Sequence, residues 1–209
     1  MAGDYTRQIP RRGFALAMAA TILMMAAASA PSLFYPQIAE QLGLVPVATT
    51  LVFAVYTFTL LAALLYLGPL SDHIGRRPVV TAGSLALALS LAMFWFADSL
   101  ATLLVARALQ GLAAGLLIPA LSAMMIDFEP PSHPNIAALW NTIGPMIGLG
   151  TGALGAALLL DLTPEPTAAV FGPLVLAFLT VAATVWSTPE LVPKTRIRRG
   201  LSLIHISEP

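Results

Sequence analysis

The sequence contains no cysteine and few charged residues, and each shortage excludes a class of protein. Without cysteine the chain has no disulfide framework, no cysteine-ligated zinc site and no thiol chemistry. Only 10% of its 209 residues are charged, whereas a soluble domain carries about 25%. So few charges cannot cover a surface that faces water, but they are enough for a surface that faces lipid. Because 10 basic residues balance 10 acidic ones, the charge gives no reason to expect nucleic acid as a partner.

Long apolar segments take the place of the missing charges, and 58% of the residues are hydrophobic. A helix that crosses a bilayer needs about 20 predominantly apolar residues. Backbone groups in lipid must be hydrogen-bonded within the segment, so such segments are helices. The sequence therefore predicts an all-α membrane protein with six transmembrane helices, near residues 14–35, 47–69, 79–97, 101–125, 136–160 and 167–187. We expect a cytoplasmic N-terminal segment over 1–13, a six-helix bundle over 14–187 and the start of a central cytoplasmic loop over 188–200.

The positions of lysine and arginine predict the orientation of this bundle. Nine of the ten basic residues precede the first span, follow the second or follow the sixth, so an even number of spans puts them on one side. The opposite loops carry only the acidic residues Glu40, Asp98, Asp161 and Glu165. Basic loops stay in the cytoplasm. We expect a multi-pass protein of the cell inner (plasma) membrane with both ends cytoplasmic. The alternative of a cleaved signal peptide over the first span is disfavoured, because five spans follow it and its removal would reverse the basic loops.

The loop between the second and third spans combines glycines and charges at a fixed spacing. Gly68 would let a helix end approach a neighbour, Gly75 permits a tight reversal, and Asp72 suits the N-terminus of another helix. A generic basic loop would account for Arg76 and Arg77 but not for this spacing. The full segment reads Gly68-Pro69-Leu70-Ser71-Asp72-His73-Ile74-Gly75-Arg76-Arg77-Pro78.

This segment resembles the signature loop of the major facilitator superfamily, Gly-x-Leu-x-Asp-Arg-x-Gly-Arg-Arg/Lys, with His73 in place of its first arginine. The resemblance implies a secondary active transporter that works by alternating access. It also implies that the six helices form two inverted three-helix repeats and make up half of a twelve-helix fold. By the same resemblance, the loop forms a conformational latch with Asp127, or alternatively Glu129, as the partner of Arg76; its residues are Gly68, Asp72, Gly75, Arg76 and Arg77.

The fourth span contains a charge, Arg107, within its apolar sequence. A charge at the bilayer centre costs roughly 2.5 to 3.5 kcal/mol on insertion scales, so it should face a cavity or a partner. Gln110 follows at i+3 on nearly the same face. Arg-x-x-Gln-Gly resembles a second motif of the family, which implies a substrate or proton pathway through Arg107 and Gln110, with Asn141 on the fifth span as a further candidate. An interfacial arginine that extends its charge to the membrane surface remains the alternative.

The fifth span carries a face of small residues. Gly144, Gly148 and Gly152 recur every four residues, and Pro145 adds a kink, so another helix can pack closely against this motif. Ordinary glycine packing is one interpretation. The other is a resemblance to the Gly-Pro-x-x-Gly motif of the drug:proton antiporter branch, which implies proton-coupled efflux of drug-like or amphipathic compounds. No carboxylate lies inside the six spans, so proton exchange would need an acid elsewhere or coupling through Arg107.

The end of the chain differs from the rest, because residues 201–209 resemble translated sequencing-adapter sequence. We expect an artefact tail, and a truncated, non-transporting fragment whose C-terminal six-helix half is missing. The partners expected of the whole transporter are a small-molecule substrate, protons and the lipid bilayer. A six-helix scaffold or a homodimerising half-transporter is the alternative. We expect no enzyme, no catalytic residues, no metal and no cofactor, because the histidines lie outside the spans and no acid pair lies within them.

Overall fold

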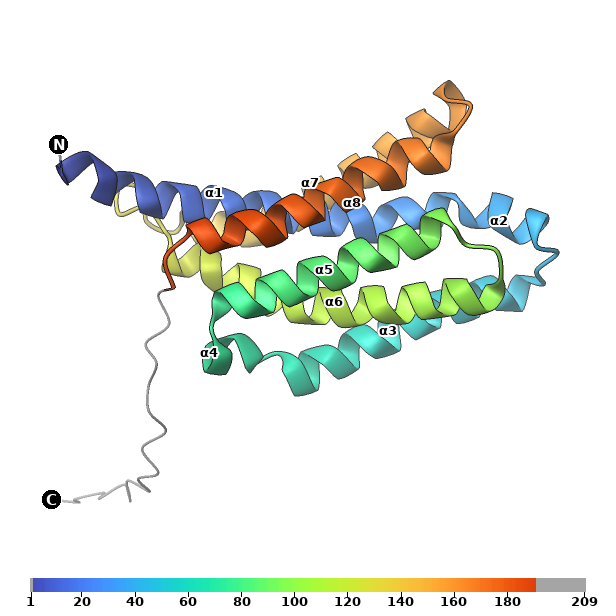
Figure 1. The fold of residues 1–209 in the computed structure, drawn as a ribbon, viewed down its shortest axis with the longest axis horizontal. Coiled ribbons are helices and arrows are strands. Elements are labelled where there is room, and N and C mark those ends of the chain that lie inside the picture. The colour runs from blue at the N-terminus through green and yellow to red at the C-terminus, as the bar shows by residue number, and fades with distance from the viewer. Residues whose placement is uncertain (1, 191–209) are drawn as a thin grey trace, which may run out of the picture.

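The structure, a computed structural model, describes the backbone of residues 2–190 and the side chains from Arg12 onward. The predicted adapter-derived tail and the loop from residue 191 lie outside these residues. Within them the chain is helical throughout and has no strand (Figure 1). Six helices are long and apolar enough to cross a membrane, which confirms the predicted fold class.

The elements follow one another as an up-and-down bundle with two short helices in its connections. The N-terminal helix α1 (Ala2–Ser29) continues through a 3₁₀ turn, η1 (Ala30–Leu33), into the short α2 (Tyr35–Gln41). The remaining elements are α3 (Pro46–Leu67), α4 (Leu70–Ile74), α5 (Arg76–Trp95), α6 (Leu100–Asp127), α7 (Ile136–Leu162), α8 (Pro166–Thr184) and a last 3₁₀ turn, η2 (Val185–Ser187).

Local chemistry explains where several of these helices begin. Pro46 and Pro166 occupy the first positions of α3 and α8, where the missing N–H of proline does no harm. Ser99 caps α6, because its Oγ accepts the backbone N–H of Thr102 at 3.2 Å. The residues at the start of these apolar segments therefore favour the beginning of a helix there.

Helix packing follows the symmetry of two inverted repeats. The most extensive contacts join α3 to α6, α5 to α6, α1 to α7 and α5 to α8, and α1 also packs on α6. Exchanging α1 with α6, α3 with α7 and α5 with α8 turns the α1–α7 contact into the α6–α3 contact. This pair of contacts is equivalent in the three-helix units α1–α5 and α6–α8, as expected of inverted repeats, whereas the extensive α5–α6 contact has only a small counterpart between α8 and α1.

The glycine face of α7 packs against α1. A Cβ on Gly148 would lie 2.6 Å from the Cβ of Met25, and one on Gly152 would lie 2.5 Å from the Cα of Ala26. Real Cβ atoms do not approach so closely, so glycine at these two positions permits the contact. Gly144 differs, because the nearest atom to its Cβ would be Ile22 Cγ1 at 3.9 Å. Gly148 and Gly152 therefore bring the two backbones together, and Gly144 does not.

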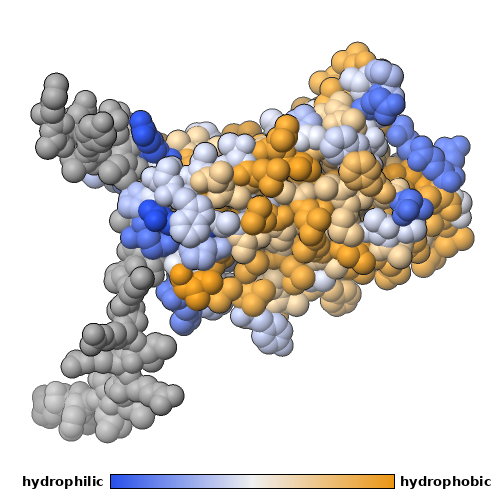
Figure 2. All heavy atoms as spheres, in the orientation of Figure 1, coloured by the Kyte–Doolittle hydropathy of each residue, from blue (hydrophilic) through white to orange (hydrophobic). Residues whose placement is uncertain are grey.

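The surface has an apolar band between two polar ends (Figure 2). The turns α3–α5 and α6–α7 and the first residues of α1 lie at one end, which we call the Arg76 end. The turns α2–α3, α5–α6 and α7–α8 lie at the other, which we call the Glu40 end. Helices α3 and α7 are the least covered and expose many large apolar side chains: Val47, Leu51, Phe58, Leu61 and Leu65 on α3, and Leu139, Met146, Leu149, Leu154 and Leu158 on α7.

Candidate functional site

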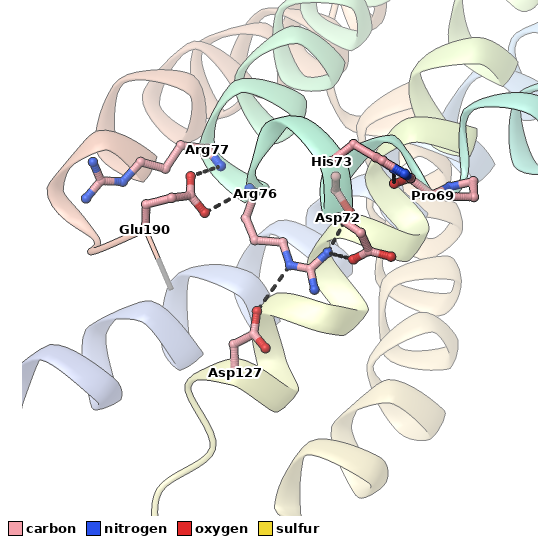
Figure 3. A network of polar contacts seen from close by, with 8 residues as sticks. Pro69, Asp72, His73, Arg76, Arg77, Asp127 and Glu190 are labelled. Carbon is pink, nitrogen blue, oxygen red and sulfur yellow. Dashed lines mark hydrogen bonds and ion pairs between the residues drawn. The ribbon is translucent and has the colours of Figure 1, made fainter. Parts of the chain in front are cut away.

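At the Arg76 end, one guanidinium joins two helices (Figure 3). The Nε of Arg76 donates to Asp127 Oδ2 at 3.1 Å, so the start of α5 is tied to the end of α6. Its Nη1 donates to Ser71 Oγ at 2.8 Å and to Asp72 Oδ1 on α4. The side chain of Arg76 is only 14% exposed, so these ionic contacts are partly shielded from water. Because they hold three segments in one arrangement, they can stabilise one conformation of this end over another.

Glu190, just after η2, holds the same turn from the opposite side. Its Oε1 accepts the backbone N–H of Arg76 at 3.0 Å and its Oε2 accepts that of Arg77 at 3.1 Å. The two N–H groups open α5, so the carboxylate caps the positive end of that helix. Gly75 precedes them with φ +103°, a conformation that side-chain-bearing residues rarely adopt, and a Cβ there would lie 2.9 Å from Glu190 Oε2. Glycine and glutamate thus form the cap together.

Other residues predicted for this loop have different places. Of the two acids considered for Arg76, Asp127 makes the contact, and Glu129 instead accepts the backbone N–H of Ala137 at 3.0 Å. His73 bonds through Nδ1 to the carbonyl of Pro69 at 2.9 Å. Gly68 does not make the expected approach to a neighbouring helix, because the three nearest atoms to a Cβ there all belong to Leu64 of its own helix.

Sequence reasoning missed Glu190. The residue follows Pro189 and looks like the first polar position of a loop, because its partners are backbone groups that no side-chain pattern reveals. An acid immediately after the last apolar helix was the only signal in the sequence.

Arg107 lies inside the bundle and not at its surface. It is 2% exposed, which rules out the interfacial arginine considered above. Its Nε donates to Tyr35 Oη, and its Nη1 donates to Gln110 Oε1 and, at 3.5 Å, to the carbonyl of Ala28. Gln110 Nε2 donates to the carbonyl of Ala27 at 2.7 Å. Arg107 and Gln110 therefore form one polar pair that links α6 to the end of α1.

Four aromatic rings surround the guanidinium of Arg107. Its Cζ lies 5.0 Å from the ring centroid of Tyr35, 5.6 Å from Phe53, 5.4 Å from Tyr56 and 5.2 Å from Phe94. A buried cation gains up to about 2 kcal/mol from such a ring, so the cage offsets part of the cost of burial. None of these four aromatic residues is among the pathway residues predicted from the sequence.

One nitrogen of this buried cation remains without a partner. Nη2 of Arg107 makes no hydrogen bond, and among the side chains of residues 12–190 no carboxylate pairs with the guanidinium. A buried donor left without a partner costs about 1–3 kcal/mol or more, and charged donors are at the upper end. The unpaired Nη2 therefore adds to the cost of placing Arg107 inside the bundle.

Asn141, the further candidate for the pathway, does not lie beside Arg107. It borders a small pocket between α1, α6 and α7 together with Ser122, and neither Arg107 nor Gln110 lines that pocket. At about 1.5 Å per residue, the 15 positions of α6 between Arg107 and Ser122 separate the two places by about 22 Å. The structure therefore divides the predicted pathway residues between two depths.

The charged signature loop and the buried arginine in the fourth span agree with the comparison with known families. The model of the Major Facilitator Superfamily matches residues 17–206. The chain belongs to this superfamily. Its six candidate membrane-spanning helices fit a multi-pass membrane protein, and members of the superfamily are in general carriers and not enzymes.

Relatives within the superfamily are named for drug export. The chain is 32% identical to the multidrug efflux pump LfrA of Mycolicibacterium smegmatis, over 94% of the chain and 44% of that protein. It is 29% identical to the puromycin resistance protein pur8 of Streptomyces alboniger, over 69% of the chain and 30% of that protein. It is 28% identical to the cephamycin export protein CmcT of Amycolatopsis lactamdurans, over 89% and 39%. The chain thus spans less than half the length of these relatives.

Proposed function

We propose that these residues form the N-terminal six-helix half of a proton-coupled exporter of small amphipathic compounds. The exporter works by alternating access in the inner (plasma) membrane, and both ends of this half are cytoplasmic. The single observation that carries the proposal is the buried, caged and incompletely bonded guanidinium of Arg107, in a chain whose relatives are named as drug exporters.

A buried cation in a membrane-spanning helix favours a transport role over a structural one. Ionisable residues within membrane spans are costly and mark substrate or ion pathways. Arg107 keeps its charge, since arginine is not deprotonated in proteins. The proton must therefore be carried by another group. We propose that an acidic side chain of a second six-helix half carries it near Nη2, and that the proton and a basic group of the substrate compete for this acid, so that substrate binding releases the proton.

The exposed faces of α3 and α7 support the proposal that a second six-helix half packs against these two helices. α3 and α7 bury the smallest shares of their apolar windows, 11% and 17%, although they are as apolar as the other spans. A twelve-helix transporter binds its substrate between two six-helix halves. The second half would cover these faces, and Arg107 would then lie near the interface between the halves.

The network around Arg76 is the proposed latch. Asp72, Asp127 and Glu190 hold the α4–α5 turn to α6 and to the end of α8, which joins all three elements at the Arg76 end. We propose that this network is intact when the cytoplasmic side is closed and is broken when that side opens. The positive-inside rule supports the assignment of this end to the cytoplasm.

The glycine face of α7 does not support the alternative of a homodimer. Gly148 and Gly152 already pack on α1 of the same chain, so they are not free to bind a second copy. A dimer through α3 and α7 would instead resemble the two-half transporter itself.

The test is ethidium efflux from cells that express the complete reading frame encoding these residues. Arg107→Ala should abolish efflux while membrane insertion is unchanged, and Arg107→Lys should restore little, because an ammonium cannot make the bonds to Tyr35 and Gln110 together. Leu176→Ala, at a position 66% exposed on α8, serves as the matched control and should export normally. Normal efflux by Arg107→Ala would remove this residue from the mechanism.

A further inference from the structure

A second polar pocket lies deeper toward the Arg76 end, between α1, α6 and α7. It has a volume of about 110 Å³ and is lined by Thr21, Met24, Met25, Ile118, Ser122 and Asn141, with Pro145 beside them. Ser122 is five residues from the end of α6 and Asn141 five residues from the start of α7. At about 1.5 Å per residue, both lie some 7–8 Å inside the helix ends. The pocket is therefore within the membrane-spanning part and close to the Arg76 end.

Of the three polar side chains in this pocket, only Thr21 makes a hydrogen bond within the described part of the chain. Thr21 donates to the carbonyl of Ala17 at 2.9 Å, the usual bond of a threonine in a membrane helix. The hydroxyl of Ser122 and the side-chain amide of Asn141 make no hydrogen bond within the described part of the chain. Unsatisfied polar groups at membrane depth cost several kcal/mol each. Both groups are thus available to something that enters the pocket.

Pro145 makes a third group available. In a helix the N–H of residue 145 would donate to the carbonyl of residue 141, but proline has no N–H. The backbone carbonyl of Asn141 therefore lacks its helical partner. Asn141 presents an amide donor, an amide acceptor and a free carbonyl at one place.

The volume and the lining residues of the pocket indicate which chemical group it can bind. An engineered apolar cavity of about 150 Å³ binds benzene, so this partly open pocket of about 110 Å³ has room for the inserted edge of one ring and not for a whole drug. Met24 and Met25 place polarisable thioethers in its wall, and such sulfurs make favourable contacts with aromatic rings. Among the side chains of residues 12–190, no charged one lines it. The chemistry fits an uncharged aromatic ring with a hydrogen-bonding substituent.

We infer that this pocket is a binding subsite for the aromatic ring of an exported compound, in which Asn141 and Ser122 bind the ring's polar substituent. The inference rests on the proposed export function and deepens it. The subsite lies about 22 Å along α6 from Arg107, so a compound arriving from the cytoplasm meets it before it meets the guanidinium. Arg107 recognises charge, whereas this subsite recognises a neutral polar ring.

Cysteine labelling tests the inference directly, because residues 1–209 contain no cysteine and any cysteine elsewhere in the reading frame is first replaced with serine. Ser122→Cys and Ser84→Cys are made in the complete reading frame and treated in membranes with a small, water-soluble methanethiosulfonate. Ser84 is the matched control: it is 0% exposed and its hydroxyl also lacks a partner, but it lines no pocket of this kind. Ser122→Cys should react about tenfold faster or more, because buried thiols without access are inert.

Puromycin, an amphipathic compound with a substituted phenyl ring, is the probe for occupancy. It should slow the labelling of Ser122→Cys, and adding Asn141→Leu should weaken this protection about three- to tenfold, as expected for lost hydrogen bonds. Thr142→Val is the control, because Thr142 is exposed and bonds only to the carbonyl of Ala138. It should leave the protection unchanged.

Two results would overturn the subsite. Equal labelling of the two cysteines would mean that the pocket is closed. Labelling that puromycin does not slow would mean that the pocket holds no ring, whatever the efflux assay shows. Puromycin efflux in the same cells separates the two claims: export without protection overturns the subsite alone, and the absence of both overturns the proposed function as well.

Discussion

Replacing Glu190 with alanine is expected to loosen the first turn of α5 without unfolding the bundle. The carboxylate accepts two backbone N–H groups, at 3.0 and 3.1 Å, and it is half-buried. Removing an N-terminal cap costs about 0.5–2 kcal/mol. Two bonds to one charged group favour the upper half of that range, and competition from water lowers the value. We therefore expect local opening of this turn to rise about five- to thirtyfold.

Amide hydrogen exchange measures this opening. In detergent or nanodiscs, a peptide that covers the α4–α5 turn should exchange faster in Glu190→Ala, and Glu190→Gln should give an intermediate rate because it keeps one acceptor without the charge. Glu165→Ala is the matched control, since Glu165 precedes α8 as an acid at the N-cap but makes no side-chain cap bond. It should leave exchange at the start of α8 unchanged.

Unchanged exchange in Glu190→Ala would refute the cap. Faster exchange over the whole bundle would also count against it, because the reasoning places the loss in one turn only. In that case the contribution of Glu190 would be to global packing.

Two further perturbations follow from the same structure. Gly148→Ala should lower the free energy of unfolding by about 1–3 kcal/mol, because its methyl group would collide with Met25 on α1. Gly155→Ala is the control and should be neutral, because a Cβ there meets no atom within 4 Å. Thermal unfolding in detergent compares the two variants. Asp127→Asn should weaken the interaction between α5 and α6 by about 0.5–1.5 kcal/mol, since the Nε of Arg76 keeps an acceptor but loses the carboxylate charge. Faster thiol labelling of Ser71→Cys at the Arg76 end reports the loss. An unaltered labelling rate would contradict the prediction.

The fold class could be predicted from the sequence because lipid leaves few choices. A run of about 20 apolar residues in a bilayer must be a helix. The predicted count of six spans is confirmed. The short α2 and α4 were not predicted, because each is a single amphipathic turn or two between spans and has too few residues to show a period.

The candidate site could be predicted only where a charge stands out from apolar surroundings. Arg107 and Gln110 were visible for that reason, and the structure brings them together. Phe53 and Phe94 were not, because one phenylalanine in an apolar helix carries no sign of what it faces. Asn141 stays a predicted pathway residue, and the structure adds that it lies in a different pocket from Arg107.

The contact of Glu190 could not be predicted from the sequence, because it depends on tertiary packing. Glu190 reaches the start of α5 only because α8 packs along α5 and ends beside it. Nothing local to residue 190 encodes that contact. Conversely, the sequence could offer both Asp127 and Glu129 for Arg76, and only the geometry of the α6 end separates them.

The orientation of the Arg76 end tests the account most directly, because the latch, the direction of export and the order of the two binding places all depend on it. A single cysteine at His73, on the α4 turn, should react with a membrane-impermeant maleimide only in inside-out vesicles, and one at Gln41, at the end of α2, only in intact cells. That pattern would place Arg76 and its partners in the cytoplasm. Labelling of His73→Cys from outside intact cells would contradict the account.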